Sequence, residues 1–344
     1  MLPANKIVST PKQKLSLLKK IVVAALSAIS LAALAGAVYQ QVGSRLDARR
    51  SPEPGKLVDV GGRRLELYCT GQLQAPGAPT VILESGLGDF LEEWQPRIQP
   101  AIAKFTRVCS YDRAGYGESD AGPMPRISSR IAADLHALLA AAGEKPPYVL
   151  LGHSFGGYIV RVFNGRYPNE VAGMVLVDSV QEDEYDELPW TSASRPGYAA
   201  DGLRHYETQA RWAPLWMGLG IGRLQYRKEL GPEAYLILQS KYLKARANEM
   251  ENIQQSAAEA RASGTLGDKP LIVLTAGKID SSLNALPPAD LQRFRTVWPE
   301  LQARLARLSA HGKQVIVPDA AHNIPGDRPD AVVAAVREVC EAIR

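Results

Sequence analysis

Cysteine is scarce in this sequence, with three residues in 344. So low a content excludes a disulfide scaffold, and the chain also has no C-x-x-C, no H-E-x-x-H and no histidine pair at metal-ligand spacing. We therefore expect no metal and no cofactor. Hydrophobic residues make up 46% and charged residues 22% of the chain, which excludes a disordered, collagen-like or coiled-coil protein.

Basic residues are in excess only near the N-terminus. Residues 1–50 hold eight Lys or Arg and one acid, whereas the remaining residues hold 32 basic and 35 acidic side chains. A nucleic-acid-binding domain needs a basic face, and this body has no net excess from which to build one. We expect no nucleic-acid partner and infer no obligate protein partner.

An uncharged apolar segment occupies residues 21–39, interrupted only by Ser27, Ser30 and Gly36. As a helix at ~1.5 Å per residue it would span roughly 29 Å, about one hydrocarbon core. A buried core helix would be amphipathic, but this segment is apolar on every face. We predict a transmembrane anchor. A cleaved signal peptide is the alternative, because Ala35-Gly36-Ala37 has the form of a cleavage site.

The charges on either side of this segment predict its orientation. Five Lys precede it, whereas three Arg and one Asp follow it before residue 51. The positive-inside rule then places the N-terminus in the cytoplasm and the body on the extracytoplasmic side, anchored or, after cleavage, secreted. The predicted organisation is a basic tail (1–20), the anchor or signal (21–39), a linker (40–55) and one domain (56–344).

The domain alternates short apolar runs with helical periodicity, which is typical of an α/β sheet. Eight strands are expected, at 56–60, 64–69, 80–84, 107–111, 148–152, 173–178, 271–275 and 314–317. Helices are expected at 127–142, 155–167, 289–309 and 328–343.

Residues 181–268 break this alternation, because they lack strand-like runs and contain Trp190, Trp212 and Trp216. Their position between the sixth and seventh strands predicts a helical cap over an active site, with aromatic side chains lining a substrate pocket. A packed helical subdomain, in which the Trp side chains are only core, is the alternative.

A strand end, a G-x-S-x-G sequence and a helix follow one another at residues 148–167. A serine on such a sharp turn projects its Oγ above the sheet, and Gly152 and Gly156 leave room for the crowded backbone. The helix that follows favours developing negative charge at its N-terminus. We predict that Ser154 is a nucleophile.

Such a serine needs a base and an oxyanion hole. Among five His, His322 follows the last predicted strand and so lies at the carboxyl edge of the sheet, where sites are built. His153, inside the turn, is expected to shape it. The N–H groups of Phe155 and of Leu87, in the Gly-rich loop after the third strand, are the expected oxyanion donors.

These residues resemble the α/β-hydrolase fold family over about residues 56–344. The resemblance is closest to exported or membrane-anchored esterase-like members, on the motifs LELYCTG (65–71), LESGLGD (83–89), YDRAGYGESD (111–120), GHSFGG (152–157) and AHNIPGDRP (321–329). It implies Ser154 as nucleophile, His322 as base and the strand order 1-2-4-3-5-6-7-8 with only the second strand antiparallel. The implied fold is an eight-stranded, mostly parallel sheet with flanking helices and a helical cap insertion.

The acid that orients His322 has two candidates. Asp178 ends the sixth strand, and Asp280 follows the seventh in a Ser- and Asn-containing loop at the G-x-x-D spacing of many α/β hydrolases. Either could fix the histidine tautomer and stabilise the imidazolium. We favour Asp178, because it leaves its strand directly and the esterase-like relatives resemble this chain better there.

A disulfide between Cys69 and Cys109 follows from the implied strand order, which sets the second strand beside the fourth in an exported and therefore oxidised domain. Two buried thiols are the alternative. Cys340, in the last helix, is left unpaired.

The sequence thus predicts a serine hydrolase that cleaves an ester or related acyl bond of a small molecule through an acyl-enzyme. A prolyl-aminopeptidase-like enzyme and a carbon–carbon bond hydrolase are alternatives, because the pocket and not the triad sets specificity. Ser154 argues against dehalogenase and epoxide-hydrolase chemistry, which uses Asp at that position. A non-catalytic binding protein on the same fold is the remaining alternative.

Overall fold

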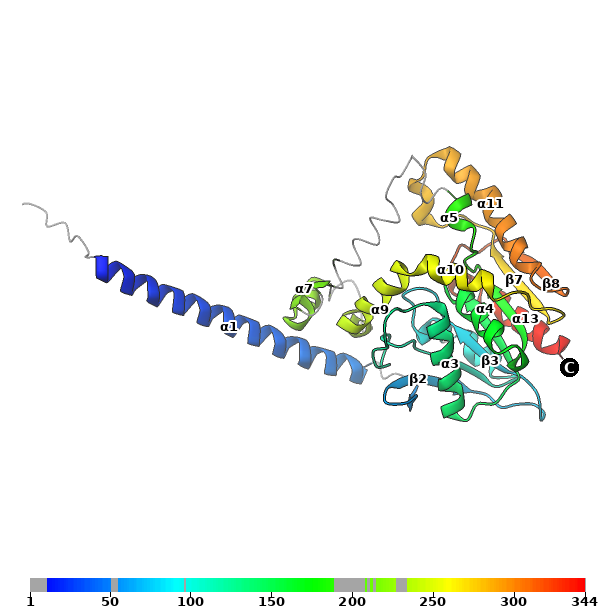
Figure 1. The fold of residues 1–344 in the computed structure, drawn as a ribbon, viewed down its shortest axis with the longest axis horizontal. Coiled ribbons are helices and arrows are strands. Elements are labelled where there is room, and N and C mark those ends of the chain that lie inside the picture. The colour runs from blue at the N-terminus through cyan, green and yellow to red at the C-terminus, as the bar shows by residue number, and fades with distance from the viewer. Residues whose placement is uncertain are drawn as a thin grey trace, which may run out of the picture. The chain divides into compact units, whose positions relative to one another are not determined.

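The computed structural model describes residues 11–50, 55–95, 97–188, 208, 211–212, 215–226 and 234–343. The chain divides into two compact units. Residues 53–211 and 240–344 form one, which we call the sheet unit; residues 1–52 and 212–239 form the other, which we call the helical unit. Figure 1 labels the elements of both.

The sheet unit is built on eight strands in the order β1-β2-β4-β3-β5-β6-β7-β8. Only β2 runs against its neighbours, and the other pairs are parallel. The strands are β1 (Lys56–Asp59), β2 (Arg64–Thr70), β3 (Thr80–Glu84), β4 (Val108–Tyr111), β5 (Tyr148–His153), β6 (Val171–Val177), β7 (Leu271–Ala276) and β8 (Gly312–Val317). The sequence prediction of strand number, order and direction is confirmed.

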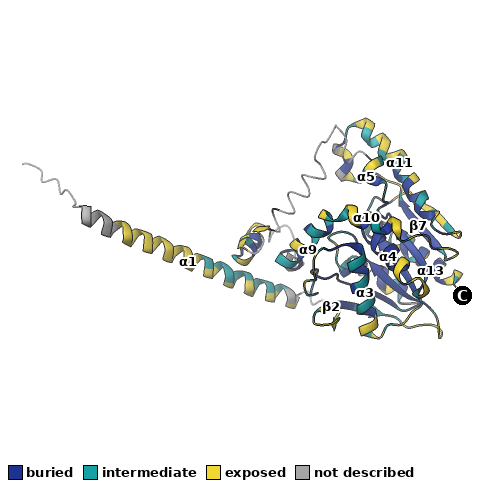
Figure 2. Ribbon diagram, in the orientation of Figure 1, coloured by how far each residue is buried: buried dark blue, intermediate teal, exposed yellow. Residues whose placement is uncertain are grey.

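The central strands form because they are apolar on both faces, as expected of parallel strands covered by helices. Along β3 and β5, Ile82 and Leu150 belong to one hydrophobic core, whereas Val81 and Leu151 belong to a second core on the opposite face. This alternation with period two is the strand geometry itself. Figure 2 shows these strands as buried elements flanked by partly exposed helices.

Helices cover both faces of the sheet. The core that contains Ile82 also takes residues from α3, α4 and α10, and the core that contains Val81 takes residues from α2 and α13. The longer helices are α3 (Ser128–Ala142), α4 (Gly156–Arg166), α9 (Ser240–Glu251), α10 (Ile253–Ala262), α11 (Pro288–Ala306) and α13 (Pro329–Ala342). The short ones are η1 (Leu91–Trp94), α2 (Ile98–Ile102), η2 (Pro168–Glu170), α5 (Glu184–Glu187), η4 (Ser281–Ala285) and α12 (Ile324–Asp327).

The antiparallel pairing of β2 with β4 sets Cys69 opposite Cys109. Their Cα atoms are 4.1 Å apart and a disulfide joins them. Cys340 is a buried free thiol. The disulfide therefore links β2 covalently to β4.

The described residues of the insertion between β6 and β7 are mostly helical, and the insertion is divided between the two units. Residues 240–262 form α9 and α10, which belong to the sheet unit, whereas residues 212–239 belong to the helical unit. The prediction of a cap lined by Trp side chains stays a prediction. Trp212 and Trp216 lie in the helical unit, and Trp190 lies outside the described residues.

The helical unit contains α1 (Pro11–Arg50), α7 (Ile221–Tyr226) and α8 (Ala234–Ile237). One stretch of α1, Leu18–Asp47, is long and apolar enough to cross a membrane. The helix extends beyond the predicted span of 21–39 at both ends and includes residues 40–50 of the predicted linker. No Gly or Pro interrupts residues 44–50, so nothing in the sequence stops the helix there.

Candidate active site

Ser154 occupies the sharp turn between β5 and α4. Its φ of 49° is in the left-handed region, which a non-glycine residue adopts only when its surroundings enforce it. The backbone around Ser154 is packed too closely for side chains at the two flanking glycines. A Cβ on Gly152 would lie 2.7 Å from the Gly156 carbonyl oxygen, and one on Gly156 would lie 2.6 Å from the Glu84 carbonyl oxygen. Glycine at both positions lets the backbone turn this tightly and lift the serine above the sheet.

His322 joins Ser154 to an acid. Its Nε2 lies 3.0 Å from Ser154 Oγ, and its Nδ1 lies 2.7 Å from Asp178 Oδ2. A carboxylate accepts only, so Nδ1 carries the proton and Nε2 is free to accept the serine proton. The three residues come from the turns after β5, β6 and β8, all at the carboxyl edge of the sheet, where ligands bind in open α/β folds.

Asp178 is the carboxylate that faces His322. Its side chain is 2% exposed, and its other oxygen, Oδ1, accepts hydrogen bonds from the Ala276 N–H at 2.9 Å and from the Trp298 Nε1–H at 2.8 Å. These donors orient the carboxylate and stabilise its charge. Asp280, the other candidate, lies among the residues that line the adjacent cavity. Sequence analysis did not identify Trp298, which comes from α11.

His153 supports the same site through a contact with the backbone of His322. Its Nε2 donates to the His322 carbonyl oxygen at 3.1 Å, and its Nδ1 lies 2.5 Å from Glu93 Oε1. Burial opposes a charge on this ring, but the Glu93 carboxylate outweighs burial and raises the pKa of His153 to about 9. A protonated His153 therefore holds the backbone of the histidine that faces Ser154, which agrees with the structural role predicted for it.

The loop 85–89 runs beside Ser154. A Cβ on Gly86 would lie 3.4 Å from the Ser154 Cβ and 2.4 Å from Asp89 Oδ2. Among the hydrogen bonds of the described residues, none uses the N–H of Leu87 or of Phe155. Both expected oxyanion donors are therefore available to a ligand.

Arg113 fixes the backbone of the loop 85–89 by hydrogen bonds to two of its carbonyl groups. Its guanidinium donates to the carbonyl oxygens of Ser85 at 2.8 Å and of Gly86 at 2.6 Å. Carbonyls held from beneath fix the orientation of the peptide groups that follow them, including the N–H of Leu87. Sequence analysis quoted Arg113 only as part of a motif and gave it no role.

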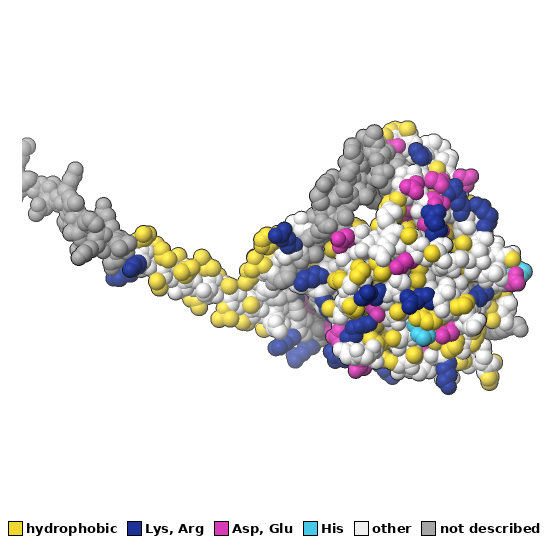
Figure 3. Space-filling view, viewed as in Figure 1, with side chains coloured by type: hydrophobic (Ala, Val, Ile, Leu, Met, Phe, Trp, Pro, Cys, Tyr) yellow, Lys and Arg dark blue, Asp and Glu magenta, His cyan; other side chains and the backbone are white. Residues whose placement is uncertain are grey.

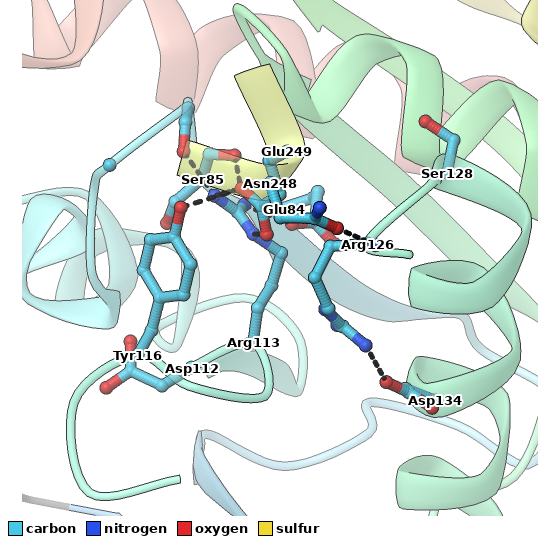
Figure 4. Close-up of polar contacts among 12 residues, drawn as sticks. Glu84, Ser85, Asp112, Arg113, Tyr116, Arg126, Ser128, Asp134, Asn248 and Glu249 are labelled. Atoms are coloured by element: carbon cyan, nitrogen blue, oxygen red, sulfur yellow. Dashed lines mark hydrogen bonds and ion pairs between the residues drawn. The ribbon is translucent and has the colours of Figure 1, made fainter. Parts of the chain in front are cut away.

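Two carboxylates fix Arg113 in turn (Figure 4). Glu84 Oε1 lies 2.8 Å from Nη1, and Glu249 Oε1 lies 3.2 Å from Nε. All three side chains are at most 2% exposed. Tyr116 donates its hydroxyl to Glu249 at 2.7 Å. Because Glu249 lies on α9, the insertion contributes directly to the support of the loop.

A second contact from α9 reaches the loop itself. The Tyr242 hydroxyl donates to the Gly88 carbonyl oxygen at 2.9 Å, and its ring stacks on Phe90 at 5.0 Å between centroids. The loop thus has α9 on one side and the Ser154 turn on the other.

A cavity of about 860 Å³ opens beside Ser154 and His322. Its apolar walls include Val180, Ile279, Leu283, Phe294 and Trp298, and its titratable groups besides Asp178 and His322 are Glu184, Lys278, Asp280 and Arg295. Burial raises the pKa of Glu184 to about 8, so this wall presents a neutral carboxyl at pH 7. Among the described residues the aromatic lining comes from α11, not from the Trp residues of the insertion.

Asp89, Glu93 and His153 are close enough to hold a metal ion, with ligand atoms within 4.8 Å of one another. A histidine ligand must be neutral, whereas these two acids favour a protonated imidazole. A second group contains Cys69 and Cys109, whose sulfurs form the disulfide. In the structure His153 and Glu93 of the first cluster form an ion pair.

Comparison with known proteins points to one fold. A family profile described as the alpha/beta hydrolase fold matches residues 79–211. The chain is 27% identical over 298 residues to an AB hydrolase superfamily protein of Gibberella zeae, covering 78% of this chain and 88% of that protein. Four further relatives are matched over 20–56% of their own length.

Solved structures extend the likeness to most of the chain. A thermophilic esterase from Thermogutta terrifontis superposes with a TM-score of 0.58 at 22% identity, covering 84% of this chain and 98% of that one. An epoxide hydrolase, CorEH, superposes with the same score at 15% identity over the same shares. The segment 79–211 that the family profile matches holds β3 to β6 and the Ser154 turn. The chain therefore has the α/β-hydrolase fold.

Proposed function

We propose that the protein is a serine hydrolase that cleaves an ester or related acyl bond. The observation that carries the proposal is the chain of contacts from Ser154 Oγ to His322 Nε2 and from His322 Nδ1 to Asp178, at 3.0 and 2.7 Å. This arrangement supplies a nucleophile, a base for its proton and an acid that stabilises the resulting imidazolium.

In the proposed reaction, Ser154 Oγ attacks the substrate carbonyl carbon while His322 Nε2 takes the serine proton. The tetrahedral oxyanion accepts hydrogen bonds from the N–H groups of Phe155 and Leu87, worth about 2.7–4 kcal/mol per donor. Collapse expels the alcohol, which takes the proton from His322. A water molecule then gives a proton to His322 Nε2 and attacks the acyl carbon. The second tetrahedral intermediate collapses and releases the acid, while Ser154 Oγ leaves and takes the proton back from His322.

The serine at position 154 favours acyl transfer over the epoxide opening named for one structural neighbour, CorEH. A serine cannot act as the carboxylate nucleophile that epoxide opening normally requires at this turn. An ester is favoured over a peptide because the cavity walls are largely apolar and, among its lining residues, Glu184 is buried and neutral at pH 7. A free amino terminus needs a charged carboxylate, which leaves Asp280 as the group an aminopeptidase would use.

We further propose that α1 anchors the protein in a membrane, with the sheet unit on the extracytoplasmic side. The length and hydropathy of Leu18–Asp47 and the lysines before it support the anchor and its orientation. The Cys69–Cys109 disulfide supports the oxidising compartment, since such bonds are rare in the cytosol.

Hydrolysis of p-nitrophenyl esters of increasing acyl length, beside a panel of aminoacyl p-nitroanilides, tests the reaction class. We expect ester turnover that is lost in Ser154→Ala. Preferential cleavage of the anilides would favour the peptidase, and activity unchanged by Ser154→Ala would contradict the proposed nucleophile. A folded protein inactive on both panels would favour the binding-protein alternative.

A further inference from the structure

A segment of the insertion packs against the apolar N-terminal helix within the helical unit. Arg223, on α7, forms an ion pair with Asp47 of α1 and donates to the Ser44 hydroxyl at 3.1 Å and to Gln40 Oε1 at 3.4 Å. The three α1 residues are spaced i, i+4 and i+7 and so share one helix face. The Arg223 side chain is only 6% exposed. One arginine thus joins α7 to two turns of α1.

The backbones approach closely on the same face. A Cβ on Gly36 would lie 2.2 Å from the Leu219 carbonyl oxygen, and one on Gly220 would lie 2.7 Å from the Gly36 carbonyl oxygen. Small residues at such crossings are typical of helix packing inside membranes. Gly36 is therefore the position that lets residues 219–220 rest on α1.

This docked segment exposes large apolar side chains away from α1. Trp212, Leu215, Ile221 and Leu224 are 53%, 56%, 48% and 70% exposed. The helix on which the segment rests is itself uncovered, with Leu34, Val38 and Val42 about half exposed or more. Figure 3 shows hydrophobic side chains along the described part of α1. A soluble protein rarely exposes so many large apolar groups in one unit, which indicates an apolar partner.

The position of the docking site along α1 identifies that partner. The apolar run begins after Lys20, and about 20 helical residues cross a hydrocarbon core of roughly 30 Å, so the core ends near Gln40. The contacts at 36, 40, 44 and 47 therefore fall at the extracytoplasmic boundary between acyl chains and headgroups. Tryptophan and arginine with aliphatic neighbours are the residues that favour this boundary.

We propose that Trp212 and residues 215–226 form a second membrane contact, which lies in the headgroup region of the bilayer beside α1. Leu215, Ile221 and Leu224 enter the outer acyl chains, and the Arg223–Asp47 pair brings no net charge to that depth. This proposal rests on the proposal that α1 spans the membrane. It is independent of the proposed hydrolase activity, because the contact does not involve the residues around Ser154.

Spin labels on the full chain in phosphatidylcholine–phosphatidylglycerol nanodiscs test this contact. Single cysteines replace Leu224, Leu31 in the middle of α1, or Leu73 on the sheet unit, which are 70%, 67% and 43% exposed. Collision rates with dissolved oxygen and with a water-soluble nickel chelate report lipid and water around each label. We expect the oxygen-to-nickel ratio at Leu224→Cys and Leu31→Cys to exceed that at Leu73→Cys several-fold.

Each other outcome is decisive. A ratio at Leu224→Cys equal to that at Leu73→Cys, with Leu31→Cys in lipid, overturns the second contact and leaves the anchor intact. A water-like ratio at Leu31→Cys overturns the anchor and the contact together. Protection of Leu224→Cys from both reagents, with dipolar broadening between labels, would show a second copy of this chain there instead.

A companion variant tests the role of the arginine. Arg223→Gln removes the ion pair with Asp47, and we expect the oxygen-to-nickel ratio at Leu224→Cys to fall toward the Leu73→Cys value. Arg337→Gln, on α13 of the sheet unit, is the matched control and should leave the ratio unchanged. Ester hydrolysis is measured on each variant to show that the sheet unit remains folded; an unchanged ratio in Arg223→Gln would overturn the docking on α1.

Discussion

Trp298 Nε1 lies 2.8 Å from Asp178 Oδ1, while the other oxygen of the same carboxylate lies 2.7 Å from His322 Nδ1. One buried carboxylate therefore has an indole on one oxygen and an imidazole on the other. The indole comes from α11, more than a hundred residues further along the chain, so the geometry of the acid depends on the packing of that helix on the sheet.

Trp298→Phe should lower kcat roughly 10- to 100-fold, because a hydrogen bond to a charged group contributes about 1.5–3 kcal/mol. KM should change less than kcat, since the substitution removes the N–H that donates to the acid but keeps an apolar aromatic ring in the cavity wall. Steady-state kinetics on a p-nitrophenyl ester measure both. Phe294→Leu is the control, because Phe294 stacks on Trp298 and lines the same cavity without donating to Asp178.

Asp178→Asn should lower kcat by about four orders of magnitude, because an amide at this position no longer fixes the productive histidine tautomer. Asp280→Asn should remain within a few-fold of the unmodified protein, since both ring nitrogens of His322 already have partners. The same kinetic assay compares the two. The reverse pattern would reassign the acid to Asp280.

Glu249→Gln should weaken the oxyanion hole without changing substrate binding. The substitution removes one of two charges that hold Arg113 under the loop 85–89, so the loop carbonyls lose their fixed donors. We expect kcat to fall about 10-fold or more with KM nearly unchanged, and a trifluoromethyl ketone inhibitor to lose affinity in parallel.

The matched control for this prediction is the neighbouring residue on the same helix. Asn248 accepts a hydrogen bond from the Arg126 N–H and has no contact with the loop. Asn248→Ala should therefore lower thermal stability while leaving inhibitor affinity intact. Equal effects of both variants on the inhibitor would mean that α9 acts only by general stabilisation.

Protein stability should fall as pH rises, in part through Glu184. Burial raises the pKa of Glu184 to about 8 in the folded protein, whereas an unfolded glutamate ionises near 4.5. Between these values the folded state binds the extra proton, so stability decreases with pH by at most about 1.4 kcal/mol per unit from this group.

Urea unfolding at pH 5, 6, 7 and 8 measures that slope. Glu184→Gln should flatten it, and Glu341→Gln, at an exposed position on α13, should not. A Glu184→Gln slope identical to that of the unmodified protein would show that this carboxyl is already ionised in the folded state.

The sheet and the strand-end positions of Ser154 and His322 were accessible from the sequence for a physical reason, whereas Asp178 was only favoured over Asp280. Strand–turn–helix transitions and strand ends are local signals, and the topology then brings Ser154, Asp178 and His322 to one edge. The supporting residues are different. Trp298 lies in an amphipathic helix where it resembles an ordinary core residue, and Glu249 lies in a polar stretch of α9. Only the packing of these helices reveals what their side chains contact.

Arg113 was the one supporting residue with a sequence signal. An arginine two residues after a buried strand, next to Asp112, is costly to bury unless it is paired, so acidic partners could have been sought. The division of the insertion between two units had no such signal, because the contacts of Gly36 and Arg223 join segments about 180 residues apart.

Treatment with a fluorophosphonate, followed by peptide mass spectrometry, tests the central claim most directly. The reagent reacts only with a serine whose proton is taken by a neighbouring base and whose oxyanion is stabilised. The account predicts one phosphonyl adduct, on Ser154, which is absent from Ser154→Ala and strongly reduced in Asp178→Asn. A folded protein that takes up no reagent, or an adduct on another residue, would contradict it.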